Sequence, residues 1–446
     1  MEVKRLPQSF LFFHAIISPE MHPISLSELI KYTWQHSDFY RHFWNQHGFD
    51  PTKYLMGEMD FKKIPIIAKE DFLSVPARGR SILDPTDWYY FTAISSGTTA
   101  PPMVCFQSCF PTPSYYHFLV SLLEKPVSST LILRPASYAS AIIGGTLRET
   151  YFNHGSIISL GEPGDLAATA RLAREINTDQ IIARPSEAIR LAPALSETGY
   201  APEQISFLWM SGEPLTNAIS TLLKKLYPQA LVLYSYAMTE GPNMLGLRSS
   251  KCEKLDILGP NTYHLNTDNY IFEVVDGLLV VTALYKIPTP LIRYKTADIA
   301  VIHENFKCSC GFKQGPIVGI GARNGNQSYK ISGVTFRSHD IASILQTMRE
   351  LVTDDFTLFI EQRADSNRLV TDIRLTMKPV ILPPNPLIAS NVKKTLEQKL
   401  YLTGSLTLGE YIRRGNATFT IDFDKNLLGK KIFPPLEIRN TFSDDS

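Results

Sequence analysis

Residues 207–240 read FLWMSGEPLTNAISTLLKKLYPQALVLYSYAMTE, and their hydrophobic pattern indicates the fold class. Two short apolar runs, Phe207–Met210 and Leu231–Tyr234, have the length of buried strands. Between them, apolar residues recur at helical spacing over Leu215–Leu226. Strand, helix and strand in this order predict a right-handed crossover between parallel strands.

The same alternation extends upstream, and residues up to about Asp60 have a helical pattern. The pattern predicts an α/β fold whose large N-terminal domain has mostly parallel sheets. The further strands are expected at Thr130–Leu133, Ser156–Leu160 and Gln180–Ala183, and the further helices at Gly164–Glu175 and Glu187–Glu197.

From Tyr270 the sequence pattern changes from alternating strands and helices to short strands. The runs Tyr270–Val275 and Leu278–Ala283 flank the hairpin signal Asp276-Gly277. We expect a β-rich subdomain over 270–320 within a domain spanning residues 1–323. After the polar break at 324–326, residues 324–446 are expected to form a small, mobile α+β C-terminal domain. Its order of elements (strand, strand, helix, strand) favours a ferredoxin-like unit. The expected elements are Ser338–Arg349, Phe356–Gln362, Leu369–Met377, Ala389–Tyr401 and Ala417–Asp422.

The composition excludes several classes of function. The 446 residues carry 44 basic and 43 acidic side chains, so nothing in the charge favours nucleic acid or an anionic membrane as a partner. The apolar run at Phe10–Ile17 is too short to span a membrane and no cleavage site follows it, so we expect a cytoplasmic protein. Five cysteines argue against a disulfide framework. The sequence leaves the oligomeric state open, a homodimer included.

Ser95, Ser96, Gly97, Thr98 and Thr99 form a loop of small and hydroxyl residues between two strand-like runs. Backbone amides and hydroxyls in such a loop can bind a phosphate, although a polar hairpin turn has the same composition. No lysine follows it, so the loop is not a P-loop of the GxxxxGK[ST] kind.

This loop resembles the phosphate-binding signature of adenylate-forming enzymes, the superfamily of acyl-CoA synthetases, luciferases and peptide-synthetase adenylation domains. That signature usually continues Gly-Lys-Pro, where this chain has Ala100, Pro101 and Pro102. Magnesium or an arginine from elsewhere would therefore have to replace the charge of the lysine.

Two further segments resemble the nucleotide motifs of this superfamily. Tyr236-Ala237-Met238-Thr239-Glu240 is similar to its Tyr-Gly-x-Thr-Glu. The resemblance implies that Tyr236 and Ala237 flank adenine, that the Thr239 hydroxyl bonds the α-phosphate, and that Glu240 holds Mg²⁺. Upstream, Gly212, Glu213 and Pro214 are similar to a segment that lines the adenine pocket.

Downstream motifs follow in the order that the superfamily has. Tyr294-Lys295-Thr296-Ala297-Asp298 resembles the superfamily's Tyr-Arg-Thr-Gly-Asp, so Asp298 matches the aspartate that accepts hydrogen bonds from both ribose hydroxyls. Arg323 matches an arginine that contacts the nucleotide. The resemblance places a hinge at Gly325 and assigns Lys430 as the catalytic lysine that reaches the acyl-phosphate during adenylation, although Lys431 beside it leaves the choice open.

The resemblance is closest to the phenylacetate–CoA ligase branch. Residues 66–71 look like that branch's Pro-x-x-x-Lys-x-Asp segment, and Cys308-Ser309-Cys310-Gly311 resembles a Cys-x-Cys pair that it carries. Cys252, His264, Cys308 and Cys310 could form a closed structural Zn²⁺ site. Three reduced buried cysteines are the alternative.

The resemblance implies a ligase that uses ATP and Mg²⁺ to convert a small aryl or short acyl carboxylic acid to an acyl-adenylate. The acyl group would then pass to coenzyme A. Transfer to an amine or a carrier protein, and a degenerate member that binds nucleotide without chemistry, are alternatives. The acid pocket is expected near Tyr138, Ile142, Gly144, Gly145, Ser235 and Met238.

Overall fold

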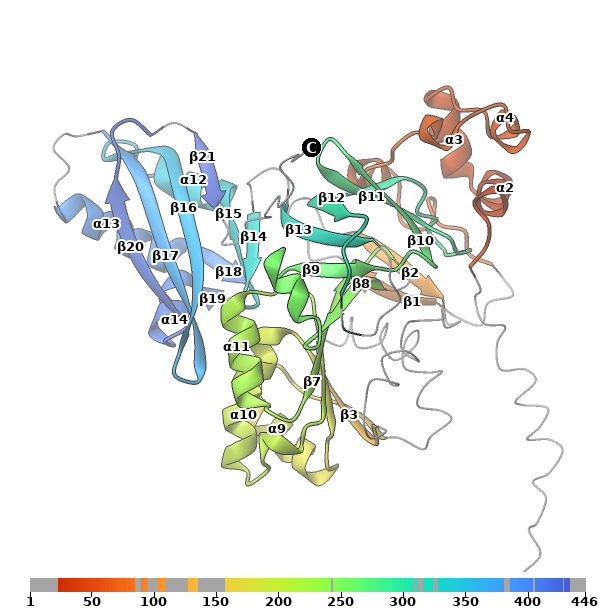
Figure 1. The fold of residues 1–446 in the computed structure, drawn as a ribbon. Helices are drawn as coiled ribbons and strands as arrows, with labels where there is room; N and C mark the ends of the chain where they lie inside the picture. The colour runs from red at the N-terminus through yellow and green to blue at the C-terminus, as the bar shows by residue number, and fades with distance from the viewer. Residues whose placement is uncertain are drawn as a thin grey trace, which may run out of the picture.

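The computed structural model describes residues 23–84, 90–94, 103–108, 127–134, 157–241, 244–308, 310, 316–323, 328–380, 386–403, 406–427 and 429–433. At residues 322, 323, 328, 330, 403, 430, 431 and 433, only the backbone is described. A large unit contains an eleven-stranded sheet, and a smaller unit lies beside it (Figure 1). No helix within these ranges has the length and apolar character needed to cross a membrane.

One half of the large sheet is parallel. Strands β7 (Leu231–Ala237), β6 (Phe207–Ser211), β5 (Gln180–Ala183), β3 (Ser129–Leu133) and β4 (Ile157–Leu160) are neighbours in this order. Helices α9 (Leu166–Glu175), α10 (Pro185–Glu197) and α11 (Asn217–Leu226) supply the crossovers. The strands and helices predicted here are confirmed, with ends that differ by no more than three residues.

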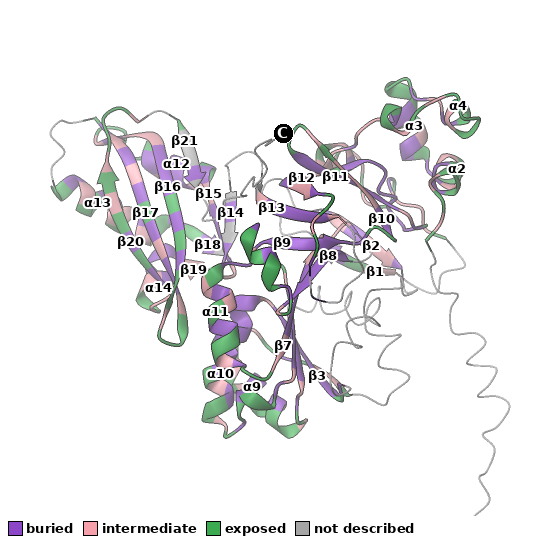
Figure 2. Ribbon diagram, in the orientation of Figure 1, coloured by how far each residue is buried: buried purple, intermediate pink, exposed green. Residues whose placement is uncertain are grey.

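Strands β3, β5 and β6 are buried on both faces, which is why they appear in the sequence as continuous apolar runs, whereas the edge strand β4 is partly exposed. Figure 2 shows the buried strands behind helices whose outer faces are exposed. Alternate side chains enter two different cores. The larger core includes Leu131, Ile181 and Leu208, and the smaller includes Ile132, Ile182 and Trp209.

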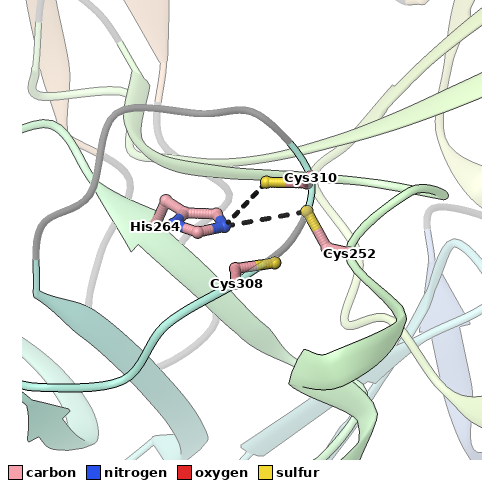
Figure 3. A group of neighbouring side chains, drawn as sticks. All are labelled: Cys252, His264, Cys308 and Cys310. Carbon is pink, nitrogen blue, oxygen red and sulfur yellow. Dashed lines mark hydrogen bonds between the residues drawn. The ribbon is translucent and has the colours of Figure 1, made fainter.

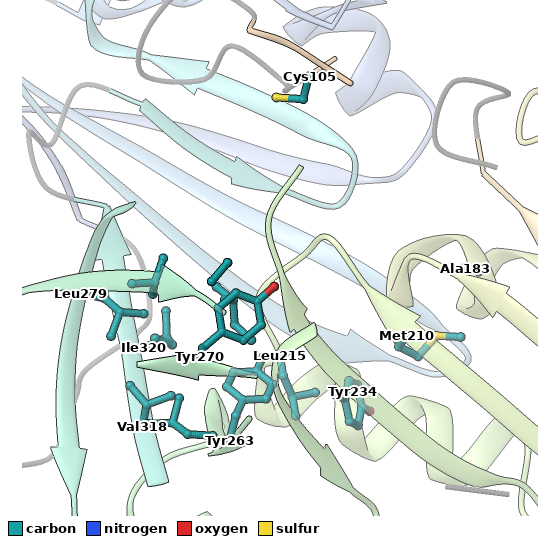
Figure 4. Close-up of a cluster of buried hydrophobic side chains, with 14 of the residues drawn as sticks. Cys105, Ala183, Met210, Leu215, Tyr234, Tyr263, Tyr270, Leu279, Val318 and Ile320 are labelled. Carbon is teal, nitrogen blue, oxygen red and sulfur yellow. The ribbon is translucent and has the colours of Figure 1, made fainter. Parts of the chain in front are cut away.

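The other half of the sheet is antiparallel. It continues from β7 through β8 (Met244–Ser249), β9 (Thr262–Leu265), β13 (Ile317–Arg323), β12 (Tyr294–His303), β11 (Leu278–Ala283) and β10 (Tyr270–Val275). The β10–β11 hairpin is confirmed, and Asp276 and Gly277 both have positive φ, as its two-residue turn requires. The β-rich region thus continues the parallel sheet, and the larger core runs beneath both halves, as Tyr234, Tyr263 and Tyr270 illustrate (Figure 4).

The N-terminal part packs against this antiparallel half. It contains α2 (Leu26–His36), α3 (Asp38–Gln46), α4 (Pro51–Leu55), η1 (Phe61–Lys63), α5 (Lys69–Leu73) and the hairpin of β1 (Tyr90–Ile94) and β2 (Val104–Ser108). A capping box between Ser25 and Glu28 begins α2. The buried Tyr40 hydroxyl donates to the Pro290 carbonyl at 2.6 Å, which anchors α3 to the segment before β12.

The smaller unit has a core of its own, with Phe336, Phe356, Leu375 and Leu396 among its members. In its four-stranded sheet, the hairpin β16–β17 is central and the edge strands β20 and β21 are each parallel to their neighbour. The expected ferredoxin-like topology is wrong, because β20 runs parallel to β17 and β21 runs parallel to β16. Its elements are β14 (Ser328–Ile331), β15 (Val334–Arg337), α12 (Ser338–Gln346), β16 (Val352–Asp365), β17 (Arg368–Pro379), α13 (Pro386–Lys399), β18 (Tyr401–Thr403), β19 (Leu406–Thr407), α14 (Leu408–Arg413), β20 (Ala417–Phe423) and β21 (Lys430–Phe433).

Candidate active site

The candidate nucleotide segments follow the carboxyl ends of neighbouring parallel strands. Gly212 and Glu213 come directly after β6, and Thr239 and Glu240 come after β7. Carboxyl ends of parallel neighbours meet at one edge of a sheet, where α/β proteins commonly bind ligands. The topology therefore brings the two segments to the same edge.

The turn after β6 requires glycine. Gly212 has φ +80°, and a Cβ atom there would lie 2.9 Å from both terminal guanidinium nitrogens of Arg134. Arg134, at the end of β3, also donates from Nη1 to the Ser211 carbonyl at 3.1 Å. The sequence analysis missed Arg134, because nothing local signals that β3 ends level with β6. Its guanidinium brings positive charge to the edge that carries Gly212.

Glu213 supports this turn through its side chain. Its carboxylate accepts hydrogen bonds from the Ser186 backbone N–H at 3.1 Å and from the Ser186 hydroxyl at 2.9 Å. Ser186 lies in the first turn of α10, where the helix dipole favours a negative charge. The Glu213 side chain is thus directed at α10, and it holds the turn after β6 in place.

A direct contact joins two motifs that lie far apart in the sequence. The Tyr236 hydroxyl donates to the Asp298 carboxylate (Oδ2) at 2.6 Å across 62 residues. Asp298 is buried, and the Tyr236 ring stacks on Tyr263 with centroids 5.7 Å apart. The structure thus brings together the two residues that the resemblance assigns to adenine and ribose.

The backbone before Asp298 is distorted in a way that fits the resemblance. Ala297 has φ +65°, in the left-handed region that favours glycine, and the superfamily has glycine at this position. The Thr296 hydroxyl accepts from the Asp298 N–H at 3.2 Å, and the register of β12 with β13 shifts between Asp298 and Ala300. Asp298 itself still pairs with Arg323, so the bulge lies directly after it.

Thr239 and Glu240 are held from the opposite side by β2 and β12. Gln107 Nε2 donates to the Thr239 carbonyl at 2.9 Å, and the Tyr294 hydroxyl lies 3.5 Å from Glu240 Oε1. Burial, with a contribution from the negative charge of Glu240, raises the pKa of Cys105 to about 12. A carboxylate in this position can ligate a hard cation that bridges phosphate oxygens.

Other predicted site residues are only partly placed. Ser95, Ser96, Gly97, Thr98 and Thr99 lie outside the described residues, as do the pocket residues Tyr138, Ile142, Gly144 and Gly145. The backbone of Arg323 pairs with that of Asp298. Ser235 accepts from the buried Trp209 indole at 2.9 Å. Lys430 begins β21, level with Phe356 of β16, in the smaller unit.

Four buried side chains converge around His264 (Figure 3). Cys252 precedes η4 (Glu253–Ile257), His264 lies on β9, and Cys308 and Cys310 follow β12. Their ligand atoms all lie within 4.8 Å of one another. His264 Nε2 is 3.7 Å from the Cys252 sulfur and 3.4 Å from the Cys310 sulfur. The predicted grouping of these four residues is therefore present in the structure.

The chemistry of this cluster fits a cation. A hydrogen bond from Cys310 lowers the pKa of Cys252 to about 4, with a further contribution from His264, while burial raises the pKa of Cys308. The Ser249 N–H donates to the Cys252 sulfur at 3.4 Å. A buried thiolate needs a compensating positive charge, and three sulfurs with one imidazole are a ligand set that zinc prefers.

Comparison with known proteins agrees with this geometry. No protein-family model matches the chain. It is 25% identical over 351 residues to the phenylacetate–coenzyme A ligase of Thermus thermophilus, covering 73% of this chain and 75% of that protein. This relative is an acid–coenzyme A ligase, which agrees with the resemblance to the adenylate-forming superfamily.

Solved structures of CoA ligases share the fold of this chain. The crystal structure of 2-hydroxyisobutyryl-CoA ligase with 2-HIB-AMP and CoA in the thioesterification state superposes with TM-score 0.61 at 16% identity, covering 92% of this chain and 88% of that chain. An open conformation of the same ligase gives TM-score 0.55 at 17% identity, with coverages of 94% and 90%.

Proposed function

We propose that this protein is an acid–thiol ligase. It activates a small carboxylic acid, aryl or short acyl, with ATP to form an acyl-adenylate and then transfers the acyl group to coenzyme A. The observation that carries the proposal is the 2.6 Å hydrogen bond between Tyr236 and Asp298. It brings two nucleotide motifs together beside the edge that also carries Gly212 and Glu240.

In the first half-reaction, the substrate carboxylate attacks the α-phosphorus of ATP. A carboxylate–phosphorus bond forms, and the bond to pyrophosphate breaks. Asp298 would accept hydrogen bonds from the ribose, Thr239 would donate to the α-phosphate, and Glu240 would hold Mg²⁺, which supplies positive charge to the phosphates. Arg134 is a candidate for the positive charge that the superfamily places at Pro101, because its guanidinium lies at the same edge as Gly212.

Lys430 can take part only after the smaller unit moves. Contacts with α11 involve Gln362 and Ser366, near the tip of the β16–β17 hairpin, whereas Lys430 lies level with Phe356. With a strand rise of about 3.3 Å per residue, the level of Phe356 is roughly 20 Å from Gln362. We therefore propose that residues 324–446 act as a lid that presents Lys430 during adenylation and withdraws it before thiol attack.

The cluster of Cys252, His264, Cys308 and Cys310 is proposed to bind a structural Zn²⁺. Its four ligands leave no open coordination position, so it would join β8, β9 and the segment after β12 without entering the reaction. The cytoplasmic location stays a prediction from the sequence, which leaves the oligomeric state open.

Pyrophosphate release with ATP, Mg²⁺ and a panel of carboxylic acids tests the proposal. Release that depends on one acid, with a thioester formed when coenzyme A is added, is the expected result. Release without a thioester, with an amide or a loaded carrier protein instead, would identify another acceptor. Binding of ATP with no release for any acid would indicate a degenerate member, which the missing lysine at Pro101 permits.

A further inference from the structure

One buried glutamine links the two units of the molecule. Gln362 lies on β16 with 8% of its surface exposed. Its Oε1 accepts a hydrogen bond from the Thr216 hydroxyl at 3.3 Å, and its Nε2 donates to the Ser332 hydroxyl at 2.6 Å. Both ends of the amide are thus engaged, one with the large unit and one with the β14–β15 turn of the smaller unit.

The partner on the large unit lies directly after the candidate adenine segment. Thr216 is the N-cap residue of α11, where its hydroxyl also accepts from the Ile219 N–H at 3.2 Å. It follows Gly212–Leu215 without a break. The contact of Gln362 with Thr216 is therefore only a few residues from the turn after β6, which Arg134 and Ser186 contact.

Polar contacts surround Gln362, and Leu369 of β17 packs against the larger core. Lys225 Nζ donates to the Ser366 carbonyl at 3.1 Å, and a Cβ atom at Gly333 would lie 3.3 Å from the Arg184 guanidinium. When the two units separate, the polar groups between them form hydrogen bonds with water instead. Such contacts therefore fix the orientation of the units but allow them to separate reversibly. The hydrogen bond from Thr216 to Gln362 then changes the ratio of docked to undocked molecules by roughly 2- to 12-fold, while the bond to Ser332 orients the amide within the smaller unit.

We propose that Gln362 is a positioning residue that holds the smaller unit in the arrangement used for acyl transfer. This inference rests on the proposed function, because Lys430 lies too far from Gln362 along the sheet to serve adenylation in the docked arrangement. Loss of the hydrogen bond to Thr216, the one that crosses between the units, should lower the docked-to-undocked ratio by roughly 2- to 12-fold. Acyl transfer depends on the docked form, whereas adenylation needs the undocked one.

The test uses Gln362→Leu, which keeps the volume and removes both hydrogen bonds. Fluorophores at the exposed positions Glu203 and Lys394 report the docked fraction by single-molecule energy transfer, without any catalysis. The ratio should fall by the factor given above. The neighbouring exposed residue provides the control Glu361→Gln, which should leave the ratio unchanged. A ratio in Gln362→Leu within twofold of the native value would overturn the proposal.

The two half-reactions provide a second readout. Thioester formation from preformed acyl-adenylate should slow in Gln362→Leu once undocked molecules predominate, while pyrophosphate release should stay the same or accelerate. Ser332→Ala should have little additional effect in the Gln362→Leu background, since the two residues share one hydrogen bond. Equal slowing of both half-reactions would mean general structural damage and would refute the positioning role. Failure of the proposed function would give a different result. The native protein would then release no pyrophosphate, while the energy-transfer signal of docking would still be present.

Discussion

Removing the metal from the cluster of Cys252, His264, Cys308 and Cys310 is the sharpest test of the site. A tetrahedral zinc ion, with bonds of about 2.3 Å to sulfur and 2.0–2.1 Å to nitrogen, separates sulfur from nitrogen by about 3.5 Å. The two sulfur–nitrogen distances in the structure are 3.7 and 3.4 Å. The ligands therefore lie within a few tenths of an ångström of these two edges of the tetrahedron, and binding needs little rearrangement.

The effect on stability follows from this preorganisation. A ligand at a hundredfold its Kd stabilises the native state by about 2.7 kcal/mol, which corresponds to about 5 °C in Tm for a unit of this size. We expect one zinc per chain by elemental analysis, a Tm about 5 °C lower after chelation, and recovery with Zn²⁺ but not with Mg²⁺. Cobalt substitution should give the visible spectrum of a tetrahedral thiolate site.

Cys310→Ser should lose the metal, because a serine hydroxyl stays protonated where a thiolate would bind. Cys105→Ser is the matched control, since Cys105 is also buried but lies outside the cluster, and its zinc content should equal that of the native protein. A purified native chain with no zinc, three titratable thiols at the cluster and a Tm indifferent to chelators would refute the reasoning.

Three substitutions test the nucleotide site and its lysine. Asp298→Asn should raise the KM for ATP about 10-fold or more, because the ribose loses a charged acceptor; an unchanged KM would contradict the ribose role. Ala297→Gly should leave activity intact and stabilise the protein by up to about 1 kcal/mol in urea unfolding, since glycine relieves the left-handed strain; clear destabilisation would count against the geometry described above. Lys430→Ala should abolish pyrophosphate release while Lys431→Ala keeps it, and the reverse result would move the catalytic role to Lys431.

The spacing of apolar residues along the chain predicted most of the strands and helices of the large sheet. The strands at β3, β5 and β6 are visible in the sequence because both of their faces are buried, and the helices between them because one face is. The hairpin at Asp276-Gly277 was equally clear, since its turn requires positive φ at both residues. Motif order was also readable from the chain, which is why Tyr236, Glu240 and Asp298 could be named before any contact between them was known.

Tertiary structure alone decided which segments meet. Strand pairing is non-local, so nothing in the sequence places β13 between β12 and β9 or sets β20 and β21 parallel to the hairpin strands. The hydrogen bond between Tyr236 and Asp298, the turn of Gly212 beneath Arg134, and the bridge from Thr216 through Gln362 to Ser332 depend on that pairing. Residue type and spacing are properties of the local chain, whereas the distance between side chains far apart in the sequence exists only once the sheet has formed.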